Sequence, residues 1–181
     1  MQNLEEKQLS TTEYYKNSFL RVHEDDVSLP DGGQSKRIVV DHIGAVNVIA
    51  LTDDKKLLLV RQYRYPLQMT TIETPAGKLE LGEAPIVTAK RELEEETGYT
   101  CGNLTLLGKH ASAPGFTNEY LYQYLAEDVQ KLDVPVDGDI DEFTELILLS
   151  KENALTMVEG GEIMDLKTVY AIQYLTLKEL W

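Results

Sequence analysis

The sequence predicts a mixed α/β sandwich. Segments with strand character outnumber those with helical character, and the helical segments lie in the middle and at the end of the chain, which is typical of this class. With 181 residues, 43% of them hydrophobic, the chain has the size of one domain with a full hydrophobic core.

The first third of the chain is predicted to form hairpins. Residues 1–10 read as a loose lead. The glycine-containing segment 30–33 is a strong turn signal, and 52–54 separates two apolar runs. The predicted strands cover residues 19–28, 37–42, 45–51, 56–63 and 71–74.

A helix is predicted in the middle of the chain, from Pro85 to just before Gly98. Proline suits the first turn of a helix, where its missing N–H costs nothing, and glycine suits the left-handed position just past the end. At about 100° per residue, the apolar side of this helix should carry Ile86, Ala89, Leu93 and Thr97.

Three carboxylates occupy a neighbouring stripe of the same helix. Glu92, Glu95 and Glu96 stand at i, i+3 and i+4, whereas Glu94 should point to solvent. Like charges at this spacing repel, and acids near a helix C-terminus oppose the macrodipole. A helix that breaks two local rules in one place suggests functional use, and clustered carboxylate oxygens suit a hard divalent cation such as Mg²⁺.

The remainder of the chain continues the mixed pattern. An acidic loop is expected at 128–141, and the C-terminal helix should present Val169, Ile172, Gln173 and Leu177 on one face. Strands are predicted at 104–110, 120–125 and 143–149, and helices at 151–158 and 166–180.

Charge and composition exclude several classes of function. A net charge of −14 argues against a nucleic-acid partner, because phosphate backbones need a basic surface. The N-terminus is polar rather than signal-like, and no apolar run approaches the ~20 residues that span a bilayer. We therefore expect a cytoplasmic protein without a membrane partner. The lone Cys101 excludes an intramolecular disulfide.

Residues 77–99 resemble the Nudix box. The matching positions are Gly77, Glu83, Arg91, Glu92, Leu93, Glu95, Glu96 and Gly98, while Tyr99 stands where an aliphatic residue is usual. The flanking segments 73–77, 61–64, 113–119 and 170–175 resemble the ADP-ribose pyrophosphatase branch, with Ala113 departing from its Ser-Pro-Gly pattern. The resemblance spans nearly the whole chain.

The resemblance implies a fold and a division of the chain. The fold is the Nudix α/β/α sandwich with a mixed sheet plus an N-terminal β-hairpin dimerisation element. Residues 1–42 would form that element, swapped in a homodimer, and residues 43–181 would form the Nudix hydrolase domain.

The resemblance also implies a reaction, namely Mg²⁺-dependent hydrolysis of ADP-ribose to AMP and ribose 5-phosphate. Glu92, Glu95, Glu96 and the Ala76 carbonyl would hold two or more Mg²⁺ ions, with Mn²⁺ as a substitute. The alternatives are a hydrolase of another nucleoside diphosphate sugar (a GDP- or UDP-sugar) and a non-catalytic Nudix-like binding module. All four glutamates of the box are present, which disfavours the binding module.

Further site residues follow from the residues and the resemblance together. Arg91, eight residues after Glu83, should pair with it and support the carboxylates. Arg64, and less surely Arg37, would clamp a phosphate. Glu73 resembles a substrate-contacting acid. The general base stays open between Glu142, Asp141, Asp139 and Glu119, and Phe19 and Tyr15 are candidates for stacking on the base.

Overall fold

The structure is a computed structural model that describes residues 3–134, 136, 138 and 143–181. The chain forms two compact units. One comprises Met1–Ala45 and Lys109–Leu121, and the other comprises Val46–Gly108 and Tyr122–Trp181. Among the described residues, no helix is long and apolar enough to cross a membrane.

The first unit contains an antiparallel sheet of order β1-β2-β3. Its strands are β1 (Lys7–Lys16), β2 (Leu20–Ser28) and β3 (Gln34–His42). The predicted strands at 19–28 and 37–42 are confirmed, but the prediction of a loose lead over 1–10 was wrong for residues 7–10, which belong to β1. Every residue of β1 is exposed, so the strand has no buried face and no alternating pattern that could reveal it. The ladder with β2 holds it instead.

A loop of the same unit is anchored to β3. The Val40 N–H donates to the Phe116 carbonyl at 2.7 Å, and the Thr117 hydroxyl donates to the Val40 carbonyl at 2.7 Å. The Asn118 side chain receives the His42 N–H at 2.9 Å. The segment that resembles the family's Ser-Pro-Gly loop is therefore fixed to β3 by backbone and side-chain hydrogen bonds, although Ala113 replaces the usual serine.

The second unit contains two sheets, of order β10-β5-β6 and β7-β4-β9-β8. Strand β5 pairs antiparallel with both its neighbours, and its first half is fully buried. The elements are β4 (Ala45–Ala50), β5 (Leu57–Arg64), η1 (Tyr65–Leu67), β6 (Met69–Glu73), β7 (Ala76–Lys78), α1 (Pro85–Thr97), β8 (Tyr99–Ala111), β9 (Tyr120–Lys131), β10 (Thr144–Leu149), α2 (Lys151–Glu159) and α3 (Leu166–Leu177).

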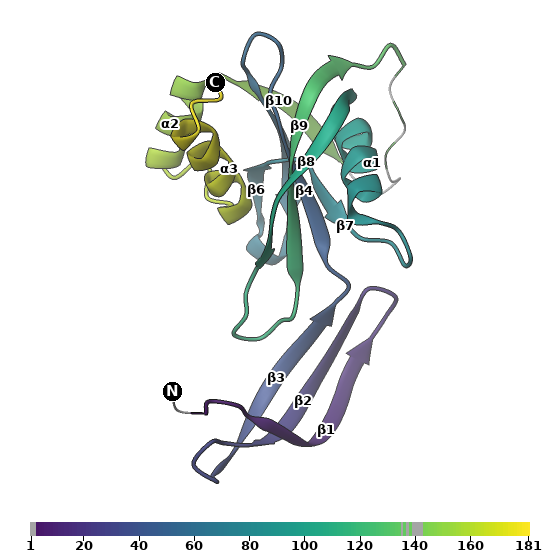
Figure 1. Cartoon of the computed structure of the whole chain (residues 1–181), viewed down its shortest axis with the longest axis vertical. Coiled ribbons are helices and arrows are strands. Elements are labelled where there is room, and N and C mark those ends of the chain that lie inside the picture. The colour runs from purple at the N-terminus through teal and green to yellow at the C-terminus, as the bar shows by residue number, and fades with distance from the viewer. Residues whose placement is uncertain (1–2, 135, 137, 139–142) are drawn as a thin grey trace. The chain divides into compact units, whose positions relative to one another are not determined.

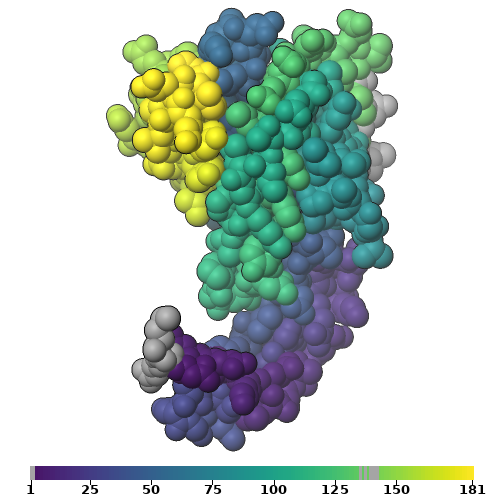
Figure 2. Space-filling model, in the orientation of Figure 1, coloured from purple at the N-terminus to yellow at the C-terminus, as the bar shows by residue number. Residues whose placement is uncertain are grey.

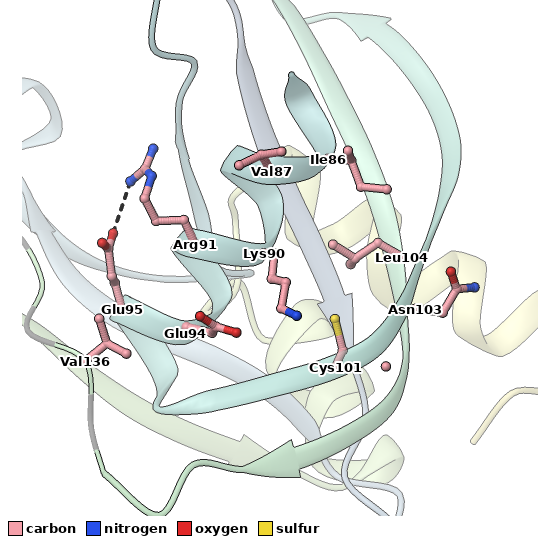
Figure 3. A pocket seen from close by; sticks show the side chains of 11 residues that line it. Ile86, Val87, Lys90, Arg91, Glu94, Glu95, Cys101, Asn103, Leu104 and Val136 are labelled. Atoms are coloured by element: carbon pink, nitrogen blue, oxygen red, sulfur yellow. Dashed lines mark hydrogen bonds and ion pairs between the residues drawn. The ribbon is translucent and has the colours of Figure 1, made fainter. Parts of the chain in front are cut away.

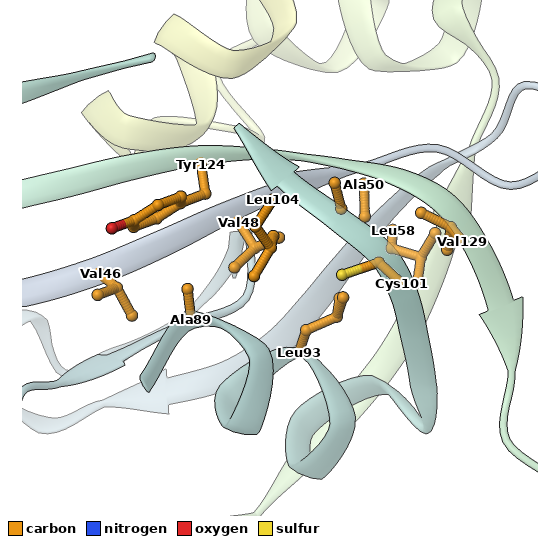
Figure 4. Packing of buried hydrophobic residues seen from close by; sticks show 11 residues of the cluster. Val46, Val48, Ala50, Leu58, Ala89, Leu93, Cys101, Leu104, Tyr124 and Val129 are labelled. Atoms are coloured by element: carbon orange, nitrogen blue, oxygen red, sulfur yellow. The ribbon is translucent and has the colours of Figure 1, made fainter. Parts of the chain in front are cut away.

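Successive side chains of β4 point to opposite faces of the sheet, and this shows the layers of the unit. Val48 packs in one cluster with Ala89 and Leu93 of α1 (Figure 4), whereas Ile49 packs in another with residues of α2 and α3. The helices thus cover opposite sides of the strands (Figures 1 and 2). The predicted α/β/α sandwich is confirmed.

Some predicted faces and boundaries were wrong. Ile86 is 45% exposed and Leu177 is 82% exposed. On α3 the buried positions include Ala171 and Leu175, so the predicted face was rotated. Strand β9 continues through residue 131, into the segment read as an acidic loop, because polar residues are tolerated on the open side of a strand.

Candidate active site

Helix α1 begins and ends where the sequence predicts. Pro85 occupies the first turn, and the chain enters it through Ala84 in an extended conformation. Gly98 adopts the left-handed conformation with φ of 69° and donates its N–H to the Glu94 carbonyl at 2.9 Å. This C-terminal stop fixes which residues of the last two turns face the strands.

The carboxylates of the stripe differ in their surroundings. Glu92 and Glu96 are buried, with 7% and 8% exposure, and Glu95 is half-buried. Glu94 does not simply face solvent as predicted, because it is half-buried and accepts a hydrogen bond from the Thr100 hydroxyl at 2.6 Å. Glu92 and Glu96 therefore lie on the buried side of α1, although other positions of the same helix are exposed to solvent.

Strand β7 receives the two buried carboxylates. The Ala76 N–H donates to Glu96 Oε2 at 2.8 Å. Glu92 lies directly on Gly77: a Cβ atom at residue 77 would stand 1.9 Å from Glu92 Oε1 and 2.0 Å from its Cδ. A side chain at residue 77 would therefore displace the Glu92 carboxylate, and glycine at this position allows the close approach of the glutamate.

Arg91 is the cation that balances these acids. Its Nη1 donates to Glu92 Oε1 at 2.9 Å and to Glu95 Oε2 at 3.0 Å, and its Nη2 lies 3.3 Å from Glu83 Oε2. The predicted pair of Glu83 and Arg91 is therefore confirmed. Burial lowers the pKa of Arg91, but the hydrogen bond to Glu83 and the charge of Glu92 outweigh it and raise the pKa well above the usual value.

The donor set is chemically suited to a hard divalent cation. The carboxylates on one stripe of α1, beside strand β7, supply the oxygen ligands that Mg²⁺ and related ions prefer. Across the described residues, no three His, Cys, Asp or Glu side chains are arranged to hold a metal ion. In this structure Arg91 forms ion pairs with Glu92 and Glu95.

Arg64 and Glu73 pair with each other. Arg64 Nε and Nη2 each donate to the Glu73 carboxylate at 2.7 Å, and Glu73 is only 3% exposed. The carboxylate also accepts from the Thr71 hydroxyl at 2.6 Å and from Lys167. Burial raises the pKa of Glu73, but the Arg64 hydrogen bond and the Lys167 charge lower it to about 2.

Arg37 and Glu119 belong to the first unit, in separate clusters. Arg37 is paired with Glu6 through Nε at 2.9 Å and Nη2 at 2.6 Å. Glu119 accepts from the Ser112 hydroxyl at 2.5 Å and lies 3.3 Å from His42 Nδ1. Both side chains therefore already have partners within that unit.

The remaining candidates are placed as follows. Phe19 stacks edge-to-face on His42 with ring centroids 5.9 Å apart, and Tyr15 is 55% exposed. Asp139, Asp141 and Glu142 lie outside the described residues. Lys167 was missed by sequence reasoning, because its partner Glu73 is 94 residues away and no local spacing connects them.

A cavity of about 470 Å³ runs along another side of α1 (Figure 3). Its walls come from α1 and β8, with Lys90, Glu94 and Leu104 among them, and Cys101 lies at its inner side. Cys101 is 6% exposed, and burial raises the pKa of its thiol. Arg91 and Glu95 also line this cavity, whereas Glu92 and Glu96, the carboxylates that contact β7, do not.

Comparison with known proteins identifies the class of this fold and site. Residues 41–164 match the NUDIX domain family, and residues 6–40 match the nucleoside diphosphate sugar hydrolase N-terminal domain. The chain belongs to the Nudix family. Divalent metal ions are generally used by the hydrolases of this family.

Two relatives are similar over nearly their whole length. An ADP-ribose pyrophosphatase from Bacillus subtilis is 47% identical over 179 residues, covering 99% of this chain and 97% of its own. A methanol dehydrogenase activator from Bacillus methanolicus is 46% identical over 175 residues, covering 97% and 95%. The crystal structure of an ADP compounds hydrolase has the same fold, with a TM-score of 0.82, 20% identity and 98% coverage of both chains.

Proposed function

We propose that this protein hydrolyses the pyrophosphate bond of ADP-ribose and releases AMP and ribose 5-phosphate, with Mg²⁺ as its metal. The observation that carries the proposal is the pair of buried box glutamates on β7, Glu92 against Gly77 and Glu96 on the Ala76 N–H. It occurs in a chain that is 47% identical over its length to an ADP-ribose pyrophosphatase.

The metal-binding role falls to the stripe of α1. Glu92, Glu95, Glu96 and the Ala76 carbonyl would hold Mg²⁺, in two or more sites. When bound, the metal neutralises the charge of the pyrophosphate and makes a bound water easier to deprotonate. The chain's own contribution is to hold these carboxylates in place, through hydrogen bonds from the Arg91 guanidinium and the β7 backbone.

Other residues would bind substrate and move the proton. Arg64, whose side chain is 40% exposed, would bind a phosphate, with Arg37 as a weaker candidate and Glu73 behind Arg64. A carboxylate outside the helix would accept the proton of the attacking water. The candidates for this base remain Glu142, Asp141, Asp139 and Glu119.

We also propose a cytoplasmic homodimer in which residues 1–42 contact the partner. Two features support this. The segment 6–40 matches a separate N-terminal domain family, and β1 presents all ten of its residues to solvent, including Leu9 and Tyr14 at 53% and 61% exposure. Sedimentation of the full chain at assay concentration should give the mass of two chains, and a monomer would contradict the proposal.

The test of the activity is a substrate panel with Mg²⁺. ADP-ribose, GDP-mannose, UDP-glucose, ADP and ATP are offered separately, and the phosphate-containing products are separated and quantified. ADP-ribose should give AMP and ribose 5-phosphate with the highest kcat/KM. Efficient turnover of a GDP- or UDP-sugar instead would be consistent with pyrophosphate hydrolysis but would contradict ADP-ribose as the preferred substrate.

A further inference from the structure

An ion network lies at the start of α3 and involves residues from three elements of the second unit. Arg64 ends β5, Glu73 ends β6, and Lys167 lies in the first turn of α3, which packs beside β6 (Figure 1). Glu73 Oε1 accepts from Arg64 Nε and from the Thr71 hydroxyl, and Oε2 accepts from Arg64 Nη2 and from Lys167 Nζ. Each oxygen of this buried carboxylate therefore has two donors.

Lys167 is held from its other side by the helix cap. Its Nζ lies 3.0 Å from Asp165 Oδ1, and its side chain is only 13% exposed. Asp165 Oδ2 accepts from the Thr168 N–H at 3.0 Å and the Thr168 hydroxyl at 2.6 Å. Since the cap fixes Asp165 and Asp165 fixes the ammonium, Lys167 has little freedom to move.

The same cap is attached to the chain that enters the Nudix box. The Thr74 N–H donates to the Thr168 hydroxyl at 2.8 Å, and Asn47 donates to the Thr74 hydroxyl at 3.3 Å. Thr74 is two residues before Ala76, whose N–H holds Glu96. The start of α3 thus contacts both Glu73 and the segment just before the proposed metal site.

The network determines how Arg64 presents its guanidinium. Nε and Nη2 each donate one N–H to Glu73, and this two-bond pair fixes the plane of the group. The described residues offer Nη1 no hydrogen bond, and the side chain keeps 40% exposure. The remaining N–H groups of a rigid cation are therefore available to an anion.

We propose that Lys167 is a positioning residue for substrate: through Glu73 it fixes the Arg64 guanidinium so that Nη1 binds a phosphate oxygen of the nucleoside diphosphate sugar. The inference rests on the proposed function, because it assumes that Arg64 contacts the pyrophosphate. It adds a residue outside the Nudix box, on the C-terminal helix, to the substrate site.

The experiment compares steady-state kinetics of wild type, Lys167→Met and Lys167→Arg on ADP-ribose with saturating Mg²⁺. An arginine that binds phosphate in both the ground state and the transition state affects KM rather than kcat. Lys167→Met should raise KM about tenfold and leave kcat within about threefold, and Lys167→Arg should recover most of the loss. Lys178→Met, an exposed lysine at the other end of α3, is the matched control and should behave as wild type.

A double-mutant cycle tests whether Lys167 acts through Arg64. If it does, Lys167→Met added to Arg64→Met should raise KM no further than Arg64→Met alone. Independent effects that multiply would overturn the inference, as would an unchanged KM in Lys167→Met or a loss confined to kcat. Wild type that does not hydrolyse ADP-ribose would instead refute the proposed function, before any variant is considered.

Folding of the variants is checked by thermal melts. Lys167→Met removes one of the two cations that face a buried carboxylate, so it is expected to lower the melting temperature. Should it fail to fold, Lys167→Met combined with Glu73→Gln removes the carboxylate charge as well and serves in its place. That pair leaves Arg64 without its anchor and should show the same rise in KM, and a wild-type KM in the pair would overturn the inference.

Discussion

Replacing Gly77 with alanine tests the contact on which the proposed metal site depends. The new Cβ would stand 1.9 Å from Glu92 Oε1 and 2.0 Å from Cδ, where carbon and oxygen normally approach no closer than about 3 Å. Glu92 is 7% exposed and is also held by Arg91 at 2.9 Å. Either the carboxylate must leave β7 or α1 and β7 must separate.

The expected cost follows from that overlap. Forcing one extra methyl group into a packed interior costs about 1–3 kcal/mol. For a chain of this size 1 kcal/mol corresponds to about 2–4 °C, so the melting temperature should fall by roughly 2–12 °C. A displacement of about 1 Å in a catalytic group costs on the order of 100-fold in rate, and kcat on ADP-ribose should fall by at least that factor.

The control experiment removes the side chain that clashes. In a Glu92→Ala background the methyl group of Gly77→Ala finds space, and the substitution should be neutral or stabilise by about 0.4–1 kcal/mol, because the unfolded chain loses freedom. Gly115→Ala, where a Cβ meets nothing within 4 Å, controls for the substitution itself. Equal destabilisation by Gly77→Ala in both backgrounds would refute the steric reasoning.

Three further predictions concern charge, pH and substrate. Glu96→Gln should lower kcat by several powers of ten in steady-state assays, whereas Glu94→Gln should cost little because Glu94 bonds Thr100 away from β7; equal losses would contradict the assignment of the stripe. The pKa of Glu73 is lowered from 4.5 to about 2 in the folded protein, so its ionised form contributes about 3 kcal/mol above pH 4.5, and this is lost as the pH falls to about 2. Between pH 5 and pH 2.5, urea unfolding should show a larger fall in the free energy of unfolding for wild type than for Glu73→Gln, and an equal fall in both proteins would exclude a contribution from Glu73. ADP-ribose should exceed GDP-mannose and UDP-glucose in kcat/KM by at least roughly tenfold, or about 1.4 kcal/mol, as measured with the panel above.

The local features of the chain could be predicted because their causes are local. Pro85 and Gly98 fix the ends of α1, and Glu83, just before the helix, is close enough along the chain to pair with Arg91. Helical geometry also places Glu92 and Glu96 on one stripe. It does not say that the stripe faces inward, because a sequence of acids reads as solvated until the strand beside it is known.

The features that were missed depend on distant partners. Strand β1 has no buried face and is held by its ladder with β2, so nothing in its own residues identifies it. Lys167 meets Glu73 only because α3 packs beside β6. Ile86 is likewise exposed because the rest of the described chain leaves it partly uncovered. Helical periodicity cannot predict which positions of a helix the rest of the chain covers.

The charge on α1 shows how a local rule can be broken without instability. From the sequence, three glutamates near a helix C-terminus imply repulsion and an unfavourable dipole contact, so neutralising one of them should stabilise the metal-free protein. The structure reverses that expectation for Glu92, because Arg91 bridges it to Glu95 and the carboxylate fills the space over Gly77. Glu96 has a partner as well, the Ala76 N–H, which a glutamine can still bond through its amide oxygen. Thermal melts in chelator should therefore show Glu92→Gln below wild type and Glu96→Gln close to it, and a higher melting temperature for Glu92→Gln would mean that repulsion outweighs the Arg91 bridge.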